Sequence, residues 1–195
     1  TDFSVTYDEN TRTVVGSQPV KAKVSGNANY SGTILLNANL VINPKEVSVE
    51  WSNLEFIYDG TAKKPTATVD TGITSDSLTL TVSGEQVNVG KNYEATATMN
   101  PVNNNYTLTN TETTYKIAAK ELTEEDIKEL GITFADGTFT YDGTEKEIEV
   151  SNLPTDFSVT YDENTRTVVG SQTVKATVSG NANYSGTILL TAKLE

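Results

Sequence analysis

The sequence contains neither cysteine nor histidine in its 195 residues. Without cysteine no disulfide framework can form, and without either residue a Cys/His metal site is excluded. Histidine is also the usual general base, so every His-based catalytic triad is excluded and only carboxylate chemistry is left to an enzyme. We therefore expect a chain that is not an enzyme and that needs no cofactor.

Positive charge and long apolar runs are scarce as well. The chain has 14 Lys and Arg against 26 Asp and Glu, a net charge of −12. Nucleic acids and anionic membrane surfaces are bound by patches of Lys and Arg, so we expect no nucleic-acid partner. No apolar run reaches the roughly 18 residues of a membrane-spanning helix, which predicts no membrane insertion.

What the chain does contain is a repeat. Residues Thr1–Leu40 return as Thr155–Leu194 with four differences, at the pairs Pro19/Thr173, Lys23/Thr177, Asn37/Thr191 and Asn39/Lys193. In both stretches apolar residues alternate with polar ones, and all four differences fall opposite the apolar series. This pattern predicts two half-buried strands whose solvent-facing side is free to vary.

A weaker copy lies between these two. "FIYDGTAKK" (Phe56–Lys64) matches "FTYDGTEKE" (Phe139–Glu147), and each is followed by a Gly and later by an Asn-Tyr pair. Gly16, Gly90 and Gly170 thus correspond, as do Tyr30, Tyr106 and Tyr184. We interpret the chain as a truncated module of type A (1–43), a complete module of type B (44–119) and a complete module of type A (120–195).

The alternation predicts an all-β fold: tandem small β-sandwich (Ig-like) modules in an elongated array. The Asp-Gly pairs at Asp59 and Asp142 predict tight turns. "LTEEDIKEL" predicts a short linker helix near 122–130, since Thr123 precedes Asp126 by three residues in a capping box. In the module of residues 120–195 we expect strands at Ile132/Phe134, Ile148/Val150, Phe157–Tyr161, Val174–Val178 and Thr187–Leu194.

Each complete module has the pattern Phe-x-Tyr-Asp-Gly-Thr, then a Gly, an Asn-Tyr pair and a Thr-rich closing strand. This pattern resembles the MBG/YDG-type tandem repeat domains of bacterial cell-surface proteins. The resemblance covers essentially the whole chain, the first module lacking its Tyr-Asp-Gly half. It implies extracellular display on a bacterial cell surface, secreted or cell-wall anchored. It also implies β-modules that serve as a repetitive stalk or adhesin region, with no catalytic residues.

Three aromatic residues are weak candidates for ligand binding. Trp51 could stack on a sugar, but its alternation with Val47 and Val49 favours burial in the core. Tyr58 precedes an Asp-Gly pair, and the simpler interpretation is that its ring packs against the turn as a structural residue. Tyr106 resembles the corner tyrosines of sandwiches. A glycan or host-protein site on the middle module is the alternative to a purely structural role.

Other polar groups have structural explanations too. "YDEN" (Tyr7–Asn10) and "DTGITSDS" (Asp70–Ser77) gather oxygen atoms but lack the spacing of a calcium loop, which favours polar turns. The chain contains lysines and many asparagines, so its composition permits a Lys–Asn isopeptide bond at Lys63, Lys64 or Lys146. The acidic residues of "ELTEEDIKEL" are expected to face water on the linker helix rather than to flank a pocket.

The truncated module predicts a partner. Its strands carry apolar faces whose complement is absent, and each large side chain left in water costs about 1.5–3 kcal/mol. We expect either preceding residues or another molecule to supply the complement. Residues Ile132–Pro154 are an eligible donor in a strand exchange or an end-to-end self-association, in addition to contacts between neighbouring repeat modules.

Overall fold

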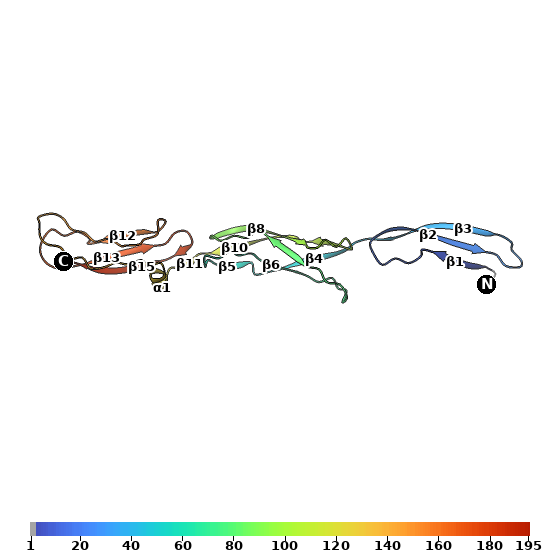
Figure 1. Ribbon diagram of the computed structural model, residues 1–195, viewed down its shortest axis with the longest axis horizontal. Coiled ribbons are helices and arrows are strands. Elements are labelled where there is room, and N and C mark those ends of the chain that lie inside the picture. Colours follow the sequence, from blue (N-terminus) through green and yellow to red (C-terminus); the bar gives the residue numbers. More distant parts are fainter. Residues whose placement is uncertain (1–2) are drawn as a thin grey trace. The chain divides into compact units, whose positions relative to one another are not determined.

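The computed structural model describes residues 3–195 (Figure 1); Thr1 and Asp2, the first residues of the truncated module, lie outside the described residues. The chain is almost entirely β with one short helix among these residues, which confirms the predicted fold class. Its contacts divide it into two compact units, and the division passes through the middle module. Among the described residues, the first unit holds residues 3–52, 66–83 and 96–113, and the second holds residues 53–65, 84–95 and 114–195.

In the first unit, β1 (Ser4–Asp8), β2 (Gly16–Ser25) and β3 (Thr33–Ile42) form an antiparallel three-stranded sheet. A second sheet places β4 (Lys45–Ser52) between β6 (Thr66–Val69) and β9 (Tyr106–Thr109). Val47 and Val49 of β4 are buried at alternate positions, as the sequence predicts. The unit is completed by β7 (Leu80–Ser83), which pairs with the end of β8 (Gly90–Met99).

The second unit contains the rest of the middle module and the whole last module. β10 (Glu112–Ala118) lies beside β5 (Glu55–Ile57) in parallel, and β11 (Lys120–Glu121) beside β14 (Tyr184–Ser185). β12 (Ser158–Asp162), β13 (Gln172–Ser179) and β15 (Thr187–Leu194) form an antiparallel sheet in the order 12-13-15. These three strands agree with the predicted ones, and Val174, Ala176 and Val178 alternate inward as expected.

The first half of the last module differs from the prediction. The strands expected at Ile132/Phe134 and Ile148/Val150 do not form, although Ile132 and Ile148 are buried. The segment is instead held by single bridges, Thr133 to Ser151, Gly137 to Leu194 and Lys146 to Arg166. Two Asp-Gly pairs and several glutamates interrupt this stretch, and residues of these types are poor strand formers. The apolar positions are therefore buried without a continuous ladder.

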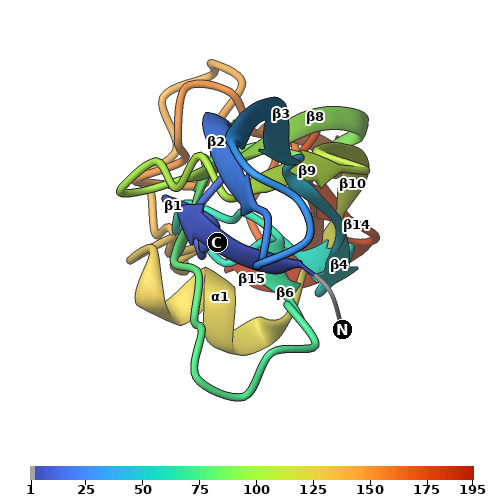
Figure 2. The ribbon, with the colours of Figure 1, turned by 90° about the vertical axis from the view of Figure 1, so that its right-hand side faces the viewer.

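The linker helix α1 spans Glu124–Glu129, slightly less than predicted (Figure 2). Thr123 caps it: its hydroxyl accepts the Asp126 N–H, and the Asp126 carboxylate accepts the Thr123 N–H at 3.0 Å, completing the capping box. Asp126 is buried and also accepts a hydrogen bond from the Lys120 ammonium. Burial opposes ionisation of Asp126, but the hydrogen bonds from Lys120 and Thr123 outweigh it and hold its pKa below the ordinary value.

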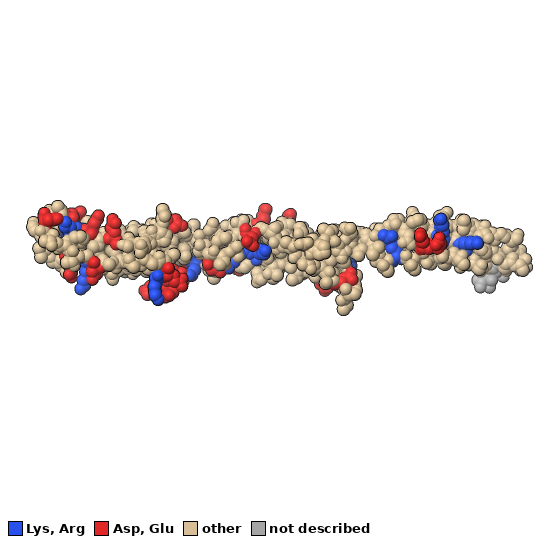
Figure 3. Space-filling model, viewed as in Figure 1, with Lys and Arg blue, Asp and Glu red and all other residues tan. Residues whose placement is uncertain are grey.

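Charged side chains are dispersed over the surface. On the face drawn in Figure 3, Lys and Arg side chains lie mostly near Asp and Glu side chains rather than gathered in one basic patch. Within residues 3–195, no helix is long and apolar enough to cross a membrane.

Replacing the buried Asp126 by asparagine should make the last module less stable in a pH-dependent manner. The lowered native pKa means that the ionised carboxylate stabilises the fold above about pH 4, and that this contribution disappears as pH falls through the native pKa. Near pH 7 we expect Asp126→Asn to cost about 1–3 kcal/mol, the usual size of hydrogen bonds to a charged group. The difference from the parent chain should shrink as the pH is lowered from about 4, measured by denaturant unfolding followed by circular dichroism.

Glu125→Gln is the matched control, because Glu125 lies on the same helix turn with an exposed carboxylate paired to Lys128. It should leave the unfolding free energy nearly unchanged. If Asp126→Asn lowers the free energy of unfolding by the same amount at pH 7 and at pH 2, the role given to the ionised carboxylate is contradicted.

Candidate docking site at the module ends

The Tyr-Asp-Gly-Thr-x-Lys motif forms a tight turn held by its aspartate. Asp59 Oδ1 accepts the Thr61 N–H at 2.9 Å and the Thr61 hydroxyl at 2.6 Å, while its Oδ2 accepts the Lys63 ammonium at 2.5 Å. Gly60 between them has φ +79°, a conformation that glycine adopts without strain. The hydrogen bond from Lys63 and then those from Thr61 hold the pKa of Asp59 well below its usual range.

The same turn recurs in the last module. Asp142 accepts Thr144 at 2.9 and 2.6 Å and Lys146 at 2.7 Å, again with φ +79° at the glycine. Each residue type in the motif thus has a structural task, and the turn presents the tyrosine that precedes the aspartate. This confirms the tight turns predicted at both Asp-Gly pairs.

The Asn-Tyr pairs belong to a second recurring turn, Asn-x-Asn-Tyr. The first asparagine accepts the N–H of the second through its side chain, at 2.8 Å in Asn27, 3.0 Å in Asn103 and 2.8 Å in Asn181. This local hydrogen bond is the reason for asparagine at the first position. It leaves the side chain of the second asparagine, Asn29, Asn105 or Asn183, free to point away from the turn.

In the first unit, that second asparagine joins the truncated module to the middle one. Asn105 Oδ1 accepts the N–H of Val15 at 3.0 Å, and the Asn105 carbonyl accepts the N–H of Lys45 at 2.9 Å. Val15 directly precedes the shared Gly16, and Lys45 begins β4. One asparagine thus binds both the loop of the preceding module and the start of its own.

The second unit repeats the same joint between the middle and last modules. Asn183 Oδ1 accepts the N–H of Val89 at 2.9 Å, and the Asn183 carbonyl accepts the N–H of Lys120 at 3.0 Å. Asn183 Nδ2 also donates to Asn88 Oδ1 at 3.1 Å. Val89 precedes Gly90 as Val15 precedes Gly16, so the two joints are built from corresponding residues.

Aromatic rings close the second joint. The Tyr184 ring packs edge-on against Tyr58 of the preceding module, with 5.6 Å between ring centroids, and against Phe157 of its own module at 5.4 Å. Burial and then the neighbouring Tyr58 raise the pKa of Tyr184 above its usual value. Edge-to-face pairs of this kind contribute about 0.5–1.5 kcal/mol beyond their buried area. Tyr58, presented by the Asp-Gly turn, therefore serves as an inter-module contact.

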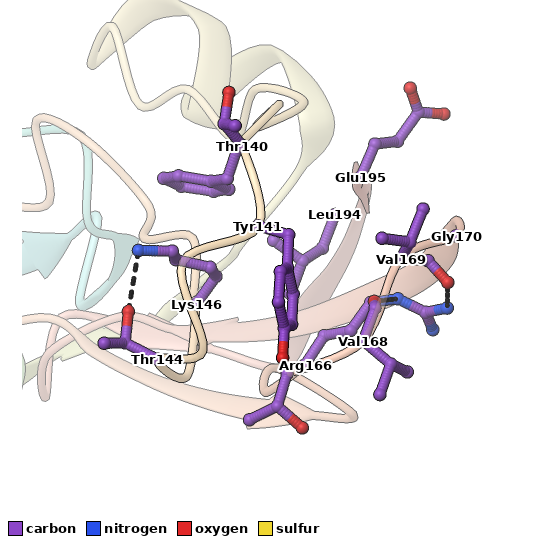
Figure 4. A pocket seen from close by; sticks show the side chains of 12 residues that line it. Thr140, Tyr141, Thr144, Lys146, Arg166, Val168, Val169, Gly170, Leu194 and Glu195 are labelled. Carbon is purple, nitrogen blue, oxygen red and sulfur yellow. Dashed lines mark hydrogen bonds between the residues drawn. The ribbon is translucent and has the colours of Figure 1, made fainter.

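In the last module the corresponding loop and turn are exposed. Tyr141 and Val169, the counterparts of Tyr58 and Val89, are 67% and 84% exposed. They line a hollow of about 70 Å³ together with Lys146, Arg166 and Leu194 (Figure 4). Small-molecule sites usually enclose roughly 300–1,000 Å³. At about 70 Å³ the hollow is large enough for only part of one side chain.

The three candidate ligand residues occupy different places. Tyr58 lies in the second joint against Tyr184. Tyr106, which follows the joint residue Asn105, is buried, and its hydroxyl donates to Asp76 Oδ2 at 2.5 Å. Trp51 is half-buried rather than fully buried, and its indole N–H donates to the Asn110 carbonyl at 2.9 Å. Ligand binding by these residues stays a prediction.

The oxygen-rich stretch 70–77 forms a loop held by its own polar groups. Asp70 accepts the Gly72 N–H at 2.8 Å, Asp76 accepts the Tyr106 hydroxyl, and the Lys45 ammonium donates to the Thr71 carbonyl. Across residues 3–195, no group of three or more Asp and Glu residues is arranged to hold a metal ion. Lys63 and Lys146, considered for isopeptide bonds, are paired with the turn aspartates.

The residues that build the joints were not identified from the sequence. The repeat places Asn105 and Asn183, and likewise Val15 and Val89, at corresponding positions but assigns them no contact. A usable signal was present, because Asn-x-Asn-Tyr occurs in all three modules at the same place in the repeat. A local turn needs only one of the two asparagines, so the second one required a separate explanation.

Comparison with known proteins agrees with this repeat architecture. The MBG domain family matches two successive segments of the chain, residues 47–121 and 131–194. A search of the curated proteins found no match to the chain. The matched segments contain both Tyr-Asp-Gly turns and the Asn-Tyr turns of both joints, and the MBG domain is a non-catalytic type of module. The chain therefore belongs to the MBG domain family, of which it carries two copies in tandem.

Proposed function

We propose that the chain is a non-enzymatic segment of a bacterial cell-surface protein, where it serves as a repetitive stalk or adhesin region. The observation that carries this proposal is the joint, which two different module pairs build from corresponding residues. A protein in which the modules are merely tethered has no need for such a contact. A stalk does need it, because a hinge at every module boundary would let the array fold back on itself.

The composition and the sites support a mechanical role. Each conspicuous polar group has a structural partner: the turn aspartates hold lysines, the buried Asp126 caps a helix, and the Asn-x-Asn-Tyr turns bind backbone. No side chain within residues 3–195 is a buried polar group without a hydrogen-bond partner, so none marks a site waiting for a substrate. Net negative charge favours solubility and opposes non-specific association, which suits display outside the cell.

A glycan- or protein-binding site on the middle module is the second candidate. The half-buried indole of Trp51, the sole tryptophan, supports it, since part of an aromatic ring at the surface can stack on a sugar. Tyr58 and Tyr106 support it less, because one ring is packed in the joint and the other is buried.

Removing the joint asparagine should loosen the contact between the middle and last modules. The chain has no native cysteine, so Lys91→Cys and Thr173→Cys give two specific spin-label sites, both exposed, on either side of the second joint. We expect a narrow label-to-label distance distribution that Asn183→Ala broadens, because it removes two hydrogen bonds with a combined value on the order of 1–2 kcal/mol.

Asn29→Ala is the matched control, as Asn29 occupies the same repeat position but lies in the truncated module, away from this joint. It should leave the distribution narrow. If the distance distribution of the parent chain is as broad as that of Asn183→Ala, the joint does not stiffen the array, and the proposal is contradicted.

The two candidate functions differ in what Trp51 should do. A glycan array probed with the labelled chain should give no specific signal if the chain is only a stalk. The binding module would be established by specific signals that are lost in Trp51→Leu, provided that the variant keeps the parent's circular dichroism spectrum. Glycan binding would then replace the stalk role as the main function.

A further inference from the structure

The sheet β1–β2–β3 has an uncovered apolar side. Ile34 and Leu36 of β3 are 64% and 53% exposed, and Phe3 is 51% exposed. Val5 and Tyr7 of β1 pair with Val24 and Ala22 of β2 and so lie on the same side. We refer to this side of the sheet, which contains Val24 and Leu36, as the open face (Figure 1, blue end).

The same face is covered in the last module. β12–β13–β15 repeats the register of β1–β2–β3: Val159 pairs with Val178 as Val5 pairs with Val24, and Ala176 pairs with Leu190 as Ala22 pairs with Leu36. Every strand residue on this face is identical in the two copies, because the four substitutions all point to the other side. Yet Val174, Ala176 and Val178 are fully buried, and Phe157 is 9% exposed where Phe3 is 51% exposed.

The cover comes from residues 120–154. Leu122, Ile127 and Ile132 form one buried cluster with Phe157 and Val178, against which Ile188 and Leu190 pack. A second cluster joins Ile148 to Val174, Ala192 and Leu194, with Phe134 packed beside it. The counterparts of Ile188 and Leu190 are Ile34 and Leu36, both exposed on the open face.

Polar groups fix the position of the cover. The Tyr161 hydroxyl accepts the Val150 N–H at 2.8 Å. The Asn164 side chain accepts the Ile148 N–H at 3.0 Å and donates to the Ile148 carbonyl at 2.8 Å, which imitates a strand pair. The counterparts of these two anchors, Tyr7 and Asn10, are exposed.

The receiving loop has its final shape without the cover. Arg12 donates to the Val14 carbonyl at 2.7 Å as Arg166 donates to the Val168 carbonyl at 2.8 Å. Gln18 and Gln172 likewise donate to the carbonyls of Glu9 and Glu163. Because these contacts are local, the site around Tyr7 and Asn10 is preorganised, and binding needs little rearrangement of the sheet.

We propose that the open face is a binding site for one further copy of the segment 120–154. The occupant is a polypeptide with that segment's spacing of apolar residues, which docks on the face as residues 120–154 dock on β12–β13–β15. Exchange of this segment between two copies of the chain does not satisfy the site. Residues 1–195 contain one such segment and two such faces, so every exchange between two copies of these residues uncovers one face for each face it covers.

A synthetic peptide of residues 120–154 added to the 195-residue chain tests the proposal. We expect saturable binding with one peptide per chain, measured by titration calorimetry, and increased hydrogen-exchange protection of β1, β2 and β3. The stoichiometry should be one rather than two, because the face of the last module is already covered. A peptide with Ile132→Asp and Ile148→Asp should not bind.

Two chain variants separate the open face from the other side of the same strand. Leu36→Asp, on the open face, should abolish binding, whereas Leu35→Asp should not. Leu35 is 65% exposed and faces the opposite side, as its counterpart Leu189 does in the covered sheet. Both side chains are more than half exposed, so neither substitution should unfold the sheet.

Three results would overturn the proposal. The first is no saturable binding of the peptide, and the second is equal binding to both leucine variants. The third is a dimer in light scattering that Leu36→Asp dissociates and the peptide does not, because the open face would then pair with itself.

Discussion

The hydrogen bond from a loop valine to the second asparagine of an Asn-x-Asn-Tyr turn is the contact on which the module array depends. It links Val15 to Asn105 in one unit and Val89 to Asn183 in the other. Both partners are supplied by turns that form locally, and so the joint needs no induced fit. The same asparagine also accepts, through its carbonyl, the N–H of the first residue of its own module's first strand, Lys45 of β4 or Lys120 of β11, which positions that strand and the joint together.

The Tyr-Asp-Gly-Thr-x-Lys turn contributes a second contact to the joint between the middle and last modules. The aspartate, threonine and lysine of the Tyr-Asp-Gly-Thr-x-Lys turn bind one another, and the glycine supplies the positive φ that the turn needs. The turn places Tyr58 where it meets Tyr184 of the next module. Residues that resemble a ligand site in isolation, an exposed tyrosine beside an acidic group, thus act as surfaces on which a neighbouring module docks.

The sequence alone was sufficient to predict the strands and their faces wherever apolar residues alternate without interruption, as in Val174–Val178, and to predict the capped helix at Thr123. It was insufficient where burial depends on distant partners. Ile132 and Ile148 are buried as their pattern indicates, but single bridges hold the segment in place of a regular strand, since the Asp, Gly and Glu residues around them are poor strand formers. Trp51 alternates with Val47 and Val49 and is still half-buried, because alternation specifies a side of the strand and not what covers it. The joint asparagines could not be found for the same reason: their partners lie in another module.

The measurement that tests the joint most directly is amide hydrogen exchange at Val15, Val89 and Val169, followed residue by residue by nuclear magnetic resonance. Val15 and Val169 lie in identical local sequence and have the same intrinsic exchange rate, which makes each the reference for the other. Our account predicts slow exchange at Val15 and Val89, whose N–H groups are bound by Asn105 and Asn183, and fast exchange at the exposed Val169. Equal, fast exchange at all three would contradict a joint formed in solution.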